Sequence, residues 1–119
     1  MIKVLVVEDE PLLMLLAIEL VENAGFEAIE ARNADEAILL LEEQSDIRIL
    51  LTDIDMPGSM DGLRLARAVR DRWPPVHVII VSGKQKPSGA ELPIRSAFFE
   101  KPYDPAKLTK TMTEFASLS

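Results

Sequence analysis

The sequence has no cysteine, so it can form neither disulfide bridges nor thiolate metal sites. It also lacks a long hydrophobic run, because no apolar stretch approaches the roughly 18 residues of a membrane-spanning helix. The apolar run at the N-terminus is too short for a secretory signal, and acidic residues follow it directly. These absences predict a cytoplasmic protein with no membrane partner.

Positive charge is also in short supply. The chain has 13 Lys and Arg residues against 20 Asp and Glu residues, which gives a net charge of −7. Proteins that bind nucleic acid normally present a basic surface that displaces counterions from phosphates, and the sequence shows none. We therefore expect no nucleic-acid partner. The 119 residues, 48% of them hydrophobic, are enough for one domain with one core.

Short apolar runs alternate with helical patterns along the chain. A run rich in β-branched residues predicts a strand at 2–7, the apolar alternation at 26–31 predicts a half-covered edge strand, and further strands are expected at 48–52, 76–81 and 97–100. Helical periodicity and capping residues predict helices at 12–23, 33–43 and 63–72 and a last helix that begins after Asp104. Strands that alternate with helices are typical of an α/β fold with a parallel sheet and helices on both faces.

Charged and polar residues follow four of the five expected strands. Glu8 and Asp9 end the first strand, Asp53 the third and Ser82 the fourth, and Lys101 follows the fifth. Because ligands of open α/β sheets bind beyond the carboxyl ends of the strands, we expect these side chains to share one site. Clustered carboxylates repel one another, and a hard divalent cation such as Mg²⁺ relieves that repulsion. A metal ion and an ammonium beside a carboxylate suit phosphoryl transfer.

These residues resemble those of the receiver domains of bacterial response regulators, and the likeness covers essentially the whole chain. The matching motifs are Glu8-Asp9, Asp53-Ile54-Asp55-Met56-Pro57, Asp61-Gly62 at the start of the third helix, Ser82, and Lys101-Pro102. The resemblance implies a flavodoxin-like, doubly wound, five-stranded parallel sheet in the order 2-1-3-4-5. It also implies that residues 1–119 form one receiver domain, which we expect to be a stand-alone regulator of two-component signalling.

The resemblance implies a metal site for Mg²⁺ or Mn²⁺. Asp9 and Asp53 would ligate the ion, and Glu8 would do so directly or through water. The backbone carbonyl of Asp55 would complete the ligands from the protein.

The resemblance also implies the phosphoryl chemistry. Asp53 would take the phosphoryl group from a histidine kinase or a histidine phosphotransfer protein. Lys101 would pair with Asp53 and then with the phosphoryl oxygens, and Ser82 would move toward the new group. Phe98, three residues before the lysine, would be the aromatic switch. Conformational signalling to a downstream protein, or onward phosphotransfer, would follow.

Two segments depart from the pattern of the family. Residues 58–62 carry one extra position before the third helix. The stretch 83–100 is short, and Pro87, Gly89 and Pro93 within it oppose a full helix. We therefore expect the fourth helix of the family to be shortened or irregular here.

The helix expected at 12–23 is more apolar than one buried face requires. The stripe that helical spacing predicts against the sheet consists of Leu13, Leu16, Ala17 and Leu20. Leu12 and Leu15 then remain outside that stripe, together with Met14 or Ile18. They could pack against the last helix, or they could form a docking surface for the helix pair of a kinase or phosphotransfer protein, since exposed apolar patches tend to mark partners.

A second functional class competes with signalling. Asp53-Ile54-Asp55 also resembles the Asp-x-Asp of haloacid-dehalogenase-like phosphohydrolases, in which one Asp is the nucleophile and the other an acid/base. That family carries its motif after the first core strand, whereas here the motif follows the third, and no acidic pair follows Lys101. A signalling phosphoacceptor that is not an enzyme is therefore the favoured interpretation. The one histidine, His77, lies early in a strand, far from the expected site, and is interpreted as structural.

Overall fold

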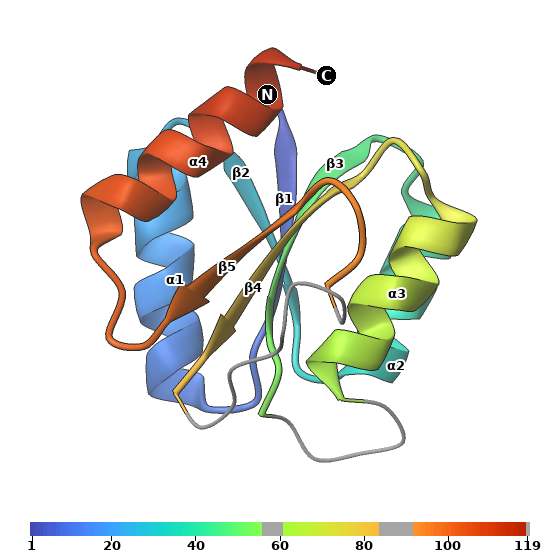
Figure 1. Ribbon diagram of the computed structural model, residues 1–119, viewed down its shortest axis with the longest axis horizontal. Coiled ribbons are helices and arrows are strands. Elements are labelled where there is room, and N and C mark those ends of the chain that lie inside the picture. The colour runs from blue at the N-terminus through green and yellow to red at the C-terminus, as the bar shows by residue number, and fades with distance from the viewer. Residues whose placement is uncertain (56–60, 84–91, 119) are drawn as a thin grey trace.

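Five parallel strands form one sheet in the computed structural model, which describes residues 1–55, 61–83 and 92–118. The strands are β1 (Lys3–Val7), β2 (Glu27–Ala31), β3 (Ile47–Asp53), β4 (His77–Ser82) and β5 (Ser96–Glu100). Their order across the sheet is β2-β1-β3-β4-β5, and each neighbouring pair is parallel. The predicted fold class and strand order are confirmed (Figure 1).

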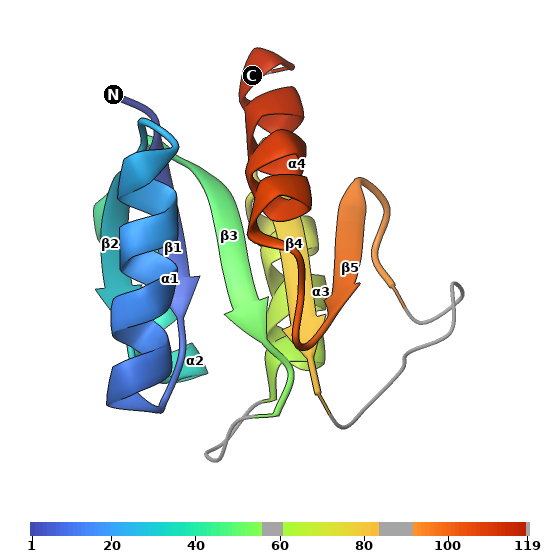
Figure 2. The same cartoon turned by 90° about the vertical axis from the view of Figure 1, so that its left-hand side faces the viewer.

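Two helices cover each face of the sheet (Figures 1 and 2). Helices α1 (Pro11–Asn23) and α4 (Pro105–Ser117) pack on one face, and α2 (Ala34–Glu43) and α3 (Gly62–Arg72) on the other. The caps predicted at Asn33 and Asp104 form, since each side chain accepts a hydrogen bond from a backbone N–H in the first turn of its helix. Asp61 caps α3 in the same way. Among the described residues, no helix has the length and apolar character needed to cross a membrane.

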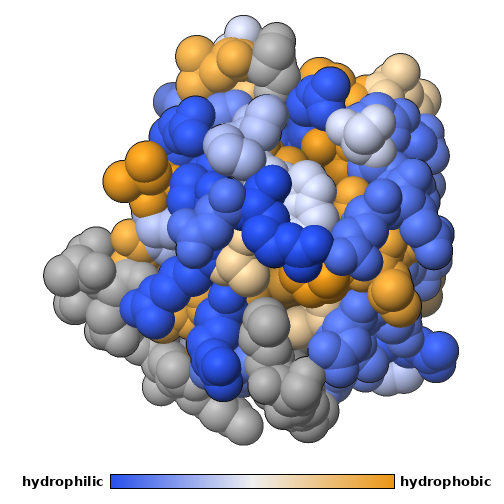
Figure 3. Space-filling view, turned by 90° about the vertical axis from the view of Figure 1, so that its right-hand side faces the viewer, coloured by the Kyte–Doolittle hydropathy of each residue, from blue (hydrophilic) through white to orange (hydrophobic). Residues whose placement is uncertain are grey.

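An apolar layer lies on each face of the sheet, and the central strands are therefore buried on both sides. Every residue of β4 is buried, as are four of the five in β1. Such strands read as continuous apolar runs because neither face meets water. The outer surface over α2 and α3 is largely hydrophilic (Figure 3), and there Arg72 of α3 donates a 2.7 Å hydrogen bond to Glu42 of α2.

The loop after β3 and the segment between β4 and β5 each include residues outside the described part of the structure. The described residues contain four helices, and none lies between β4 and β5. The expected shortened or irregular helix concerns the stretch 83–100, of which residues 84–91 lie outside the described part. The extra position expected in 58–62 also falls mostly outside it, because residues 56–60 are not described.

A buried arginine that the sequence did not single out holds the start of β5. Arg70 of α3 is 9% exposed, and its guanidinium donates hydrogen bonds to the carbonyl oxygens of Pro74 (2.7 Å), Ile94 (2.8 Å) and Arg95 (3.1 Å). Arg95 has a φ of 56°, in the left-handed region. One planar side chain with several fixed donors thus ties the turn before β5 to the end of α3.

The inward face of α1 differs from the predicted one. Ala17 is buried as expected, but Met14 and Val21 are buried with it, whereas Leu16 is 53% exposed. The sheet is covered by this rotated face, and Leu13, Leu16 and Leu20 instead line a groove between α1 and α4. The apolar run made both faces look equally suitable, so spacing alone chose the wrong one. Leu12 and Leu15 are 67% and 61% exposed, outside the buried face as expected.

His77 begins β4 at the end of the sheet opposite the carboxyl edge and is 8% exposed. Its ring stacks on that of Phe115 from α4, with centroids 4.8 Å apart and an interplanar angle of 12°. Burial, together with the positive charges of Arg70 and Arg95, lowers the pKa of His77 below its ordinary value. The buried, neutral ring is therefore part of the packing between β4 and α4.

Replacing His77 by Phe should remove a pH dependence of stability. In the unfolded chain the histidine gains a proton near pH 6.5, whereas its lowered pKa keeps it neutral in the folded protein. The unfolded state then binds more protons, so the wild type should lose stability relative to His77→Phe as the pH falls below about 6.5. Urea unfolding of both proteins across this range measures the difference, in which the other titrating groups cancel. Parallel stability profiles would contradict the expectation.

Candidate functional site

The carboxyl edge of the sheet brings together side chains from the ends of four strands. Glu8 follows β1, and its backbone N–H donates to the carbonyl of Ala31 at 3.0 Å. Asp53 is the last residue of β3 and Ser82 the last of β4. The backbone N–H of Lys101 donates to the carbonyl of Ser82 at 2.9 Å, which extends the β4–β5 ladder past its end. Parallel pairing therefore places these residues in one region.

The carboxylate of Asp53 has a bonding partner on each oxygen. Lys101 Nζ lies 2.6 Å from Oδ2, and the backbone N–H of Asp55 donates to Oδ1 at 2.9 Å. Asp53 is 5% exposed, so burial strengthens both contacts relative to water. This arrangement holds a buried carboxyl group in a fixed position beside a cation.

Glu8 shares the lysine with Asp53. Its Oε1 lies 3.5 Å from Lys101 Nζ, and its Oε2 accepts a hydrogen bond from the N–H of Glu10 at 3.2 Å. Burial raises the pKa of Glu8 to about 7, and the nearby carboxyl groups of Asp53 and Asp9 act in the same direction. The rise reflects mainly the loss of water around the buried carboxyl, which the hydrogen bond from Glu10 and the charge of Lys101 offset only in part.

Lys101 responds in the opposite way. Burial alone would lower the pKa of its ammonium, but the hydrogen bond and charge of Asp53, with those of Glu8, outweigh that effect and raise the pKa above its ordinary value. Lys101 is therefore a permanent cation at neutral pH. The Lys101–Pro102 peptide bond is cis.

Ser82 is connected to the acidic cluster through a residue whose side chain the sequence did not single out. Ser82 is fully buried, and its Oγ donates a 2.9 Å hydrogen bond to Oδ2 of Asp55. The sequence suggested only the backbone carbonyl of Asp55 as functional. Asp55 is also the second acid of the Asp-x-Asp motif that resembles phosphohydrolases. Nothing in the sequence pattern, however, predicts a contact between its side chain and Ser82.

Gly62 explains why an Asp-Gly pair opens α3. A Cβ atom at this position would lie 2.0 Å from the backbone oxygen of Asp53. The N–H of Gly62 also donates to the carbonyl of Ile54 at 3.2 Å, while the carboxylate of Asp61 caps the helix. The missing side chain lets the start of α3 pack directly against the backbone of Asp53.

The donor chemistry at this edge fits a hard divalent cation. Glu8 and Asp53 are buried oxygen donors, and Asp9, the residue next to Glu8, is half-buried. Within residues 1–55, 61–83 and 92–118, no three acidic or histidine side chains already form a cluster that could hold a metal ion. Mg²⁺ needs only one or two carboxylates from a protein because it retains several waters.

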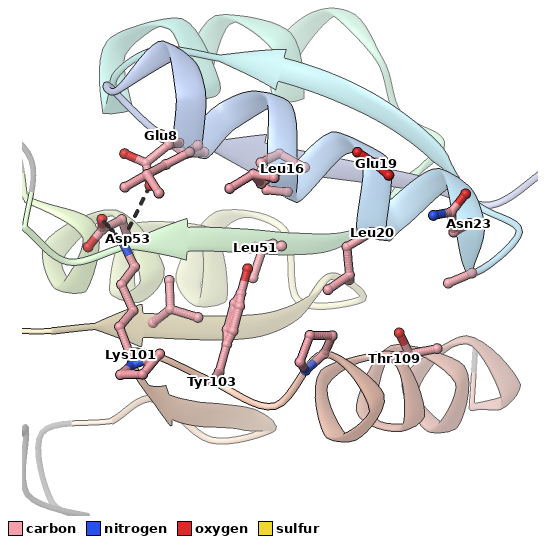
Figure 4. Close-up of a pocket in the computed structure, with 18 of the residues that line it drawn as sticks. Glu8, Leu16, Glu19, Leu20, Asn23, Leu51, Asp53, Lys101, Tyr103 and Thr109 are labelled. Carbon is pink, nitrogen blue, oxygen red and sulfur yellow. Dashed lines mark hydrogen bonds and ion pairs between the residues drawn. The ribbon is translucent and has the colours of Figure 1, made fainter.

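A groove of about 910 Å³ leads away from Asp53 between α1 and α4. Figure 4 shows Asp53, Glu8 and Lys101 at one end, with Leu16 and Leu20 of α1 facing Tyr103 across the space. The walls are mainly apolar. The sequence predicted the surplus of leucines on this helix but not the groove, because the separation of α1 and α4 depends on how both helices sit on the sheet.

Phe98 lies on β5, where it pairs with Ile80 of β4 in the ladder. It is half-buried and packs against the apolar layer on the α2–α3 side of the sheet. Phe99, the next residue, packs on the α1–α4 side, as alternation along a strand requires. The proposed switch residue is thus placed on the face opposite the groove.

Together the doubly wound sheet and the carboxylate–ammonium cluster at its carboxyl edge define an α/β protein with an acidic site at the strand ends. The response regulator receiver domain family matches this chain over residues 4–113. The chain therefore belongs to that family, and the predicted resemblance is confirmed.

Relatives and solved structures agree with this assignment. The chain is 32% identical over 115 residues to the sensor kinase CckA of Brucella abortus (strain 2308), covering 93% of this chain and 12% of the kinase. It is 33% identical over 109 residues to the nitrogen assimilation regulatory protein NtrX of Azorhizobium caulinodans, covering 88% of this chain and 24% of that protein. A crystal structure of a response regulator receiver protein from Pseudomonas putida superposes with a TM-score of 0.83 at 29% identity, covering 95% of this chain and 96% of that one.

These two curated relatives are much longer than the chain. It spans 12% of the kinase and 24% of the regulator, so in both proteins the matching domain is one part of a larger chain.

Replacing Gly62 by Ala should destabilise the protein, although Ala is normally the better helix residue. The new Cβ would meet the backbone of Asp53, which must shift, and we expect a loss of about 1–3 kcal/mol in the free energy of unfolding. Gly83→Ala is the matched control, because a Cβ there would lie at an ordinary 3.6 Å from Lys101 Cβ. Urea unfolding measures both variants, and equal stability of the two would contradict the proposed contact.

Proposed function

We propose that Asp53 accepts a phosphoryl group from a phosphohistidine of a histidine kinase or of a histidine phosphotransfer protein. The observation that carries the proposal is the buried Asp53 carboxylate with the Lys101 ammonium 2.6 Å from one of its oxygens. An ammonium has three donors, so Lys101 can bond the carboxylate and a phosphoryl oxygen together. We place the reaction in the cytoplasm and assign no nucleic-acid or membrane partner to this domain.

In the transfer step, an oxygen of Asp53 forms a bond to phosphorus while the bond from phosphorus to the imidazole nitrogen of the donor breaks. The imidazole leaves with the electron pair of that bond. The product is an acyl phosphate on Asp53 that carries about −1.5 to −2 charges at neutral pH. Lys101, already paired with Asp53, offsets part of that charge.

The acidic edge supports a role for Mg²⁺ or Mn²⁺, and receiver domains typically use Mg²⁺. We assign Asp9 and Asp53 as ligands, with Glu8 binding directly or through water and the Asp55 carbonyl completing the set. The burial of both the Glu8 and the Asp53 carboxyl groups at one edge supports this assignment, because a dication relieves the repulsion between buried carboxylates. When bound, the ion neutralises charge on the transferring phosphoryl oxygens.

The signal then passes through contacts that differ between the two states. We propose that Ser82 moves toward the phosphoryl group and that Phe98 changes its packing on β5. The outcome is binding of a downstream protein or onward phosphotransfer, and the chain acts as a signalling phosphoacceptor rather than as a turnover enzyme.

The donor, we propose, docks on α1 beside the groove. Leu12 and Leu15 are 67% and 61% exposed, and the apolar groove runs from this helix to Asp53. Exposed apolar surface next to a reacting group suits the helix pair of a kinase or phosphotransfer protein.

Incubation with Mg²⁺ and acetyl phosphate or phosphoramidate should add one phosphoryl group, which Asp53→Asn should abolish because the amide is a poor nucleophile. Intact-mass spectrometry measures the adduct. An adduct that persists in Asp53→Asn would refute the assignment of the acceptor. Continuous hydrolysis of many phosphate esters would instead favour the phosphohydrolase alternative.

Leu15→Asp should slow transfer from a cognate phosphohistidine donor by about tenfold or more, as expected for a contact at the centre of an interface. Labelling by acetyl phosphate should stay unchanged, because that donor needs no docking surface. Leu39→Asp is the matched control, since Leu39 is 56% exposed on α2, across the sheet from α1. Phosphotransfer followed with a radiolabelled donor would contradict the docking site if both variants reacted at the wild-type rate.

A further inference from the structure

We infer that the side chain of Asp55 is a latch that holds the Ser82 hydroxyl away from Asp53 until phosphorylation. This inference rests on the proposed phosphorylation of Asp53. The observation behind it is the 2.9 Å hydrogen bond from Ser82 Oγ to Asp55 Oδ2.

Ser82 has a single proton to donate. A hydroxyl carries one O–H, whereas a phosphoryl group at neutral pH offers acceptor oxygens. The O–H of Ser82 can therefore serve Asp55 or the phosphoryl group, but not both at full strength. Lys101 meets no such conflict, because its ammonium carries three donors. Of Ser82 and Lys101, only Ser82 must release Asp55 in order to donate its hydrogen bond to the phosphoryl group.

The backbone of Ser82 is held in place by strand pairing, so a change of hydrogen-bond acceptor involves its side chain and not the strand. Ser82 pairs with Glu100 in the β4–β5 ladder, and its carbonyl accepts the N–H of Lys101 at 2.9 Å. A change of acceptor then requires a rotation between staggered χ1 positions rather than a movement of the strand. Such a side chain has discrete states, as a two-state switch requires.

Asp55 is suited to this role because it is tied to both groups. Its backbone N–H donates to Asp53 Oδ1 at 2.9 Å, while its carboxylate accepts from Ser82. A hydrogen bond to an ionised carboxylate is stronger than one to a neutral acceptor. Asp55 therefore stabilises the unphosphorylated arrangement and opposes the bond from Ser82 to the phosphoryl group.

The test uses beryllofluoride, a non-reactive mimic of a phosphoryl group on a carboxylate, with Mg²⁺ at saturation. ¹⁹F NMR gives the concentration needed for half-saturation in four proteins: the wild type, Asp55→Ala, Ser82→Ala and the double variant. Asp55→Ala should bind about tenfold more tightly than the wild type, the factor that corresponds to about 1.4 kcal/mol. In the Ser82→Ala background, the same substitution should change binding by less than about twofold.

This cycle separates the latch from a simple effect of charge. Removing the Asp55 carboxylate could also strengthen the binding of beryllofluoride simply by removing a negative charge. That gain in affinity would be the same in the wild-type and in the Ser82→Ala background. An equal gain, or no gain in the wild-type background, overturns the inference. Failure of the wild type to bind beryllofluoride at all would instead count against the proposed acceptor role of Asp53.

A conservative variant and a structural readout complete the test. Asp55→Asn keeps an oxygen acceptor without the charge, so its gain should be about threefold, and it serves in the cycle if Asp55→Ala fails to fold. Without beryllofluoride, the amide resonance of Gly83 in the Asp55 variant should move toward its position in the beryllofluoride-bound wild type. An unmoved resonance overturns the inference.

Discussion

The ammonium of Lys101 lies 2.6 Å from an oxygen of Asp53 and 3.5 Å from an oxygen of Glu8 at the buried carboxyl edge of the sheet. Both carboxylates are less than one-tenth exposed, so water does little to separate their charges. A cation between them reduces the repulsion that burial would otherwise make costly. Because each residue follows a different strand, this one charge also joins the ends of β1, β3 and β5.

The surrounding backbone fixes the position of that charge cluster. Gly62 lets α3 approach the oxygen of Asp53 more closely than any residue with a Cβ could. At the far end of α3, Arg70 bonds three carbonyl oxygens and so holds the turn from which β5 starts toward Lys101. Asp53 and the start of the strand that leads to Lys101 are thus both in contact with α3, one at each end of the helix. Rigid support of this kind keeps reacting groups in place without cost at the moment of reaction.

The site combines fixed and changeable contacts. In the proposed function, Lys101 retains Asp53 while it gains a phosphoryl oxygen, whereas Ser82 has one proton, which it now donates to Asp55. The groove beside them opens between α1 and α4, on the face opposite Phe98. In the proposed function, the phosphoryl donor therefore docks on the α1–α4 side of the sheet. The change in Phe98 packing takes place on the α2–α3 side.

Much of this protein could be predicted from local patterns. Alternating strand and helix signals determined the fold, and the positions of Glu8, Asp53, Ser82 and Lys101 after successive strands determined which residues meet. Both follow from the rule that parallel strands carry their carboxyl ends to one edge. Helix caps such as those at Asn33 and Asp104 could also be predicted from the sequence, because a cap depends only on residues within one turn of the helix.

The buried face of α1 was decided only by tertiary structure. An almost continuous apolar run has no periodicity strong enough to choose between Met14 and Leu16, so the contact with the sheet made the choice. The hydrogen bond from Ser82 to Asp55 likewise spans 27 positions of sequence. The contacts of Arg70 with Ile94 and Arg95 depend on a turn that arrives from beyond β4. Residue type and spacing determine which elements form, but side chains far apart in the chain find their partners only when the elements are packed.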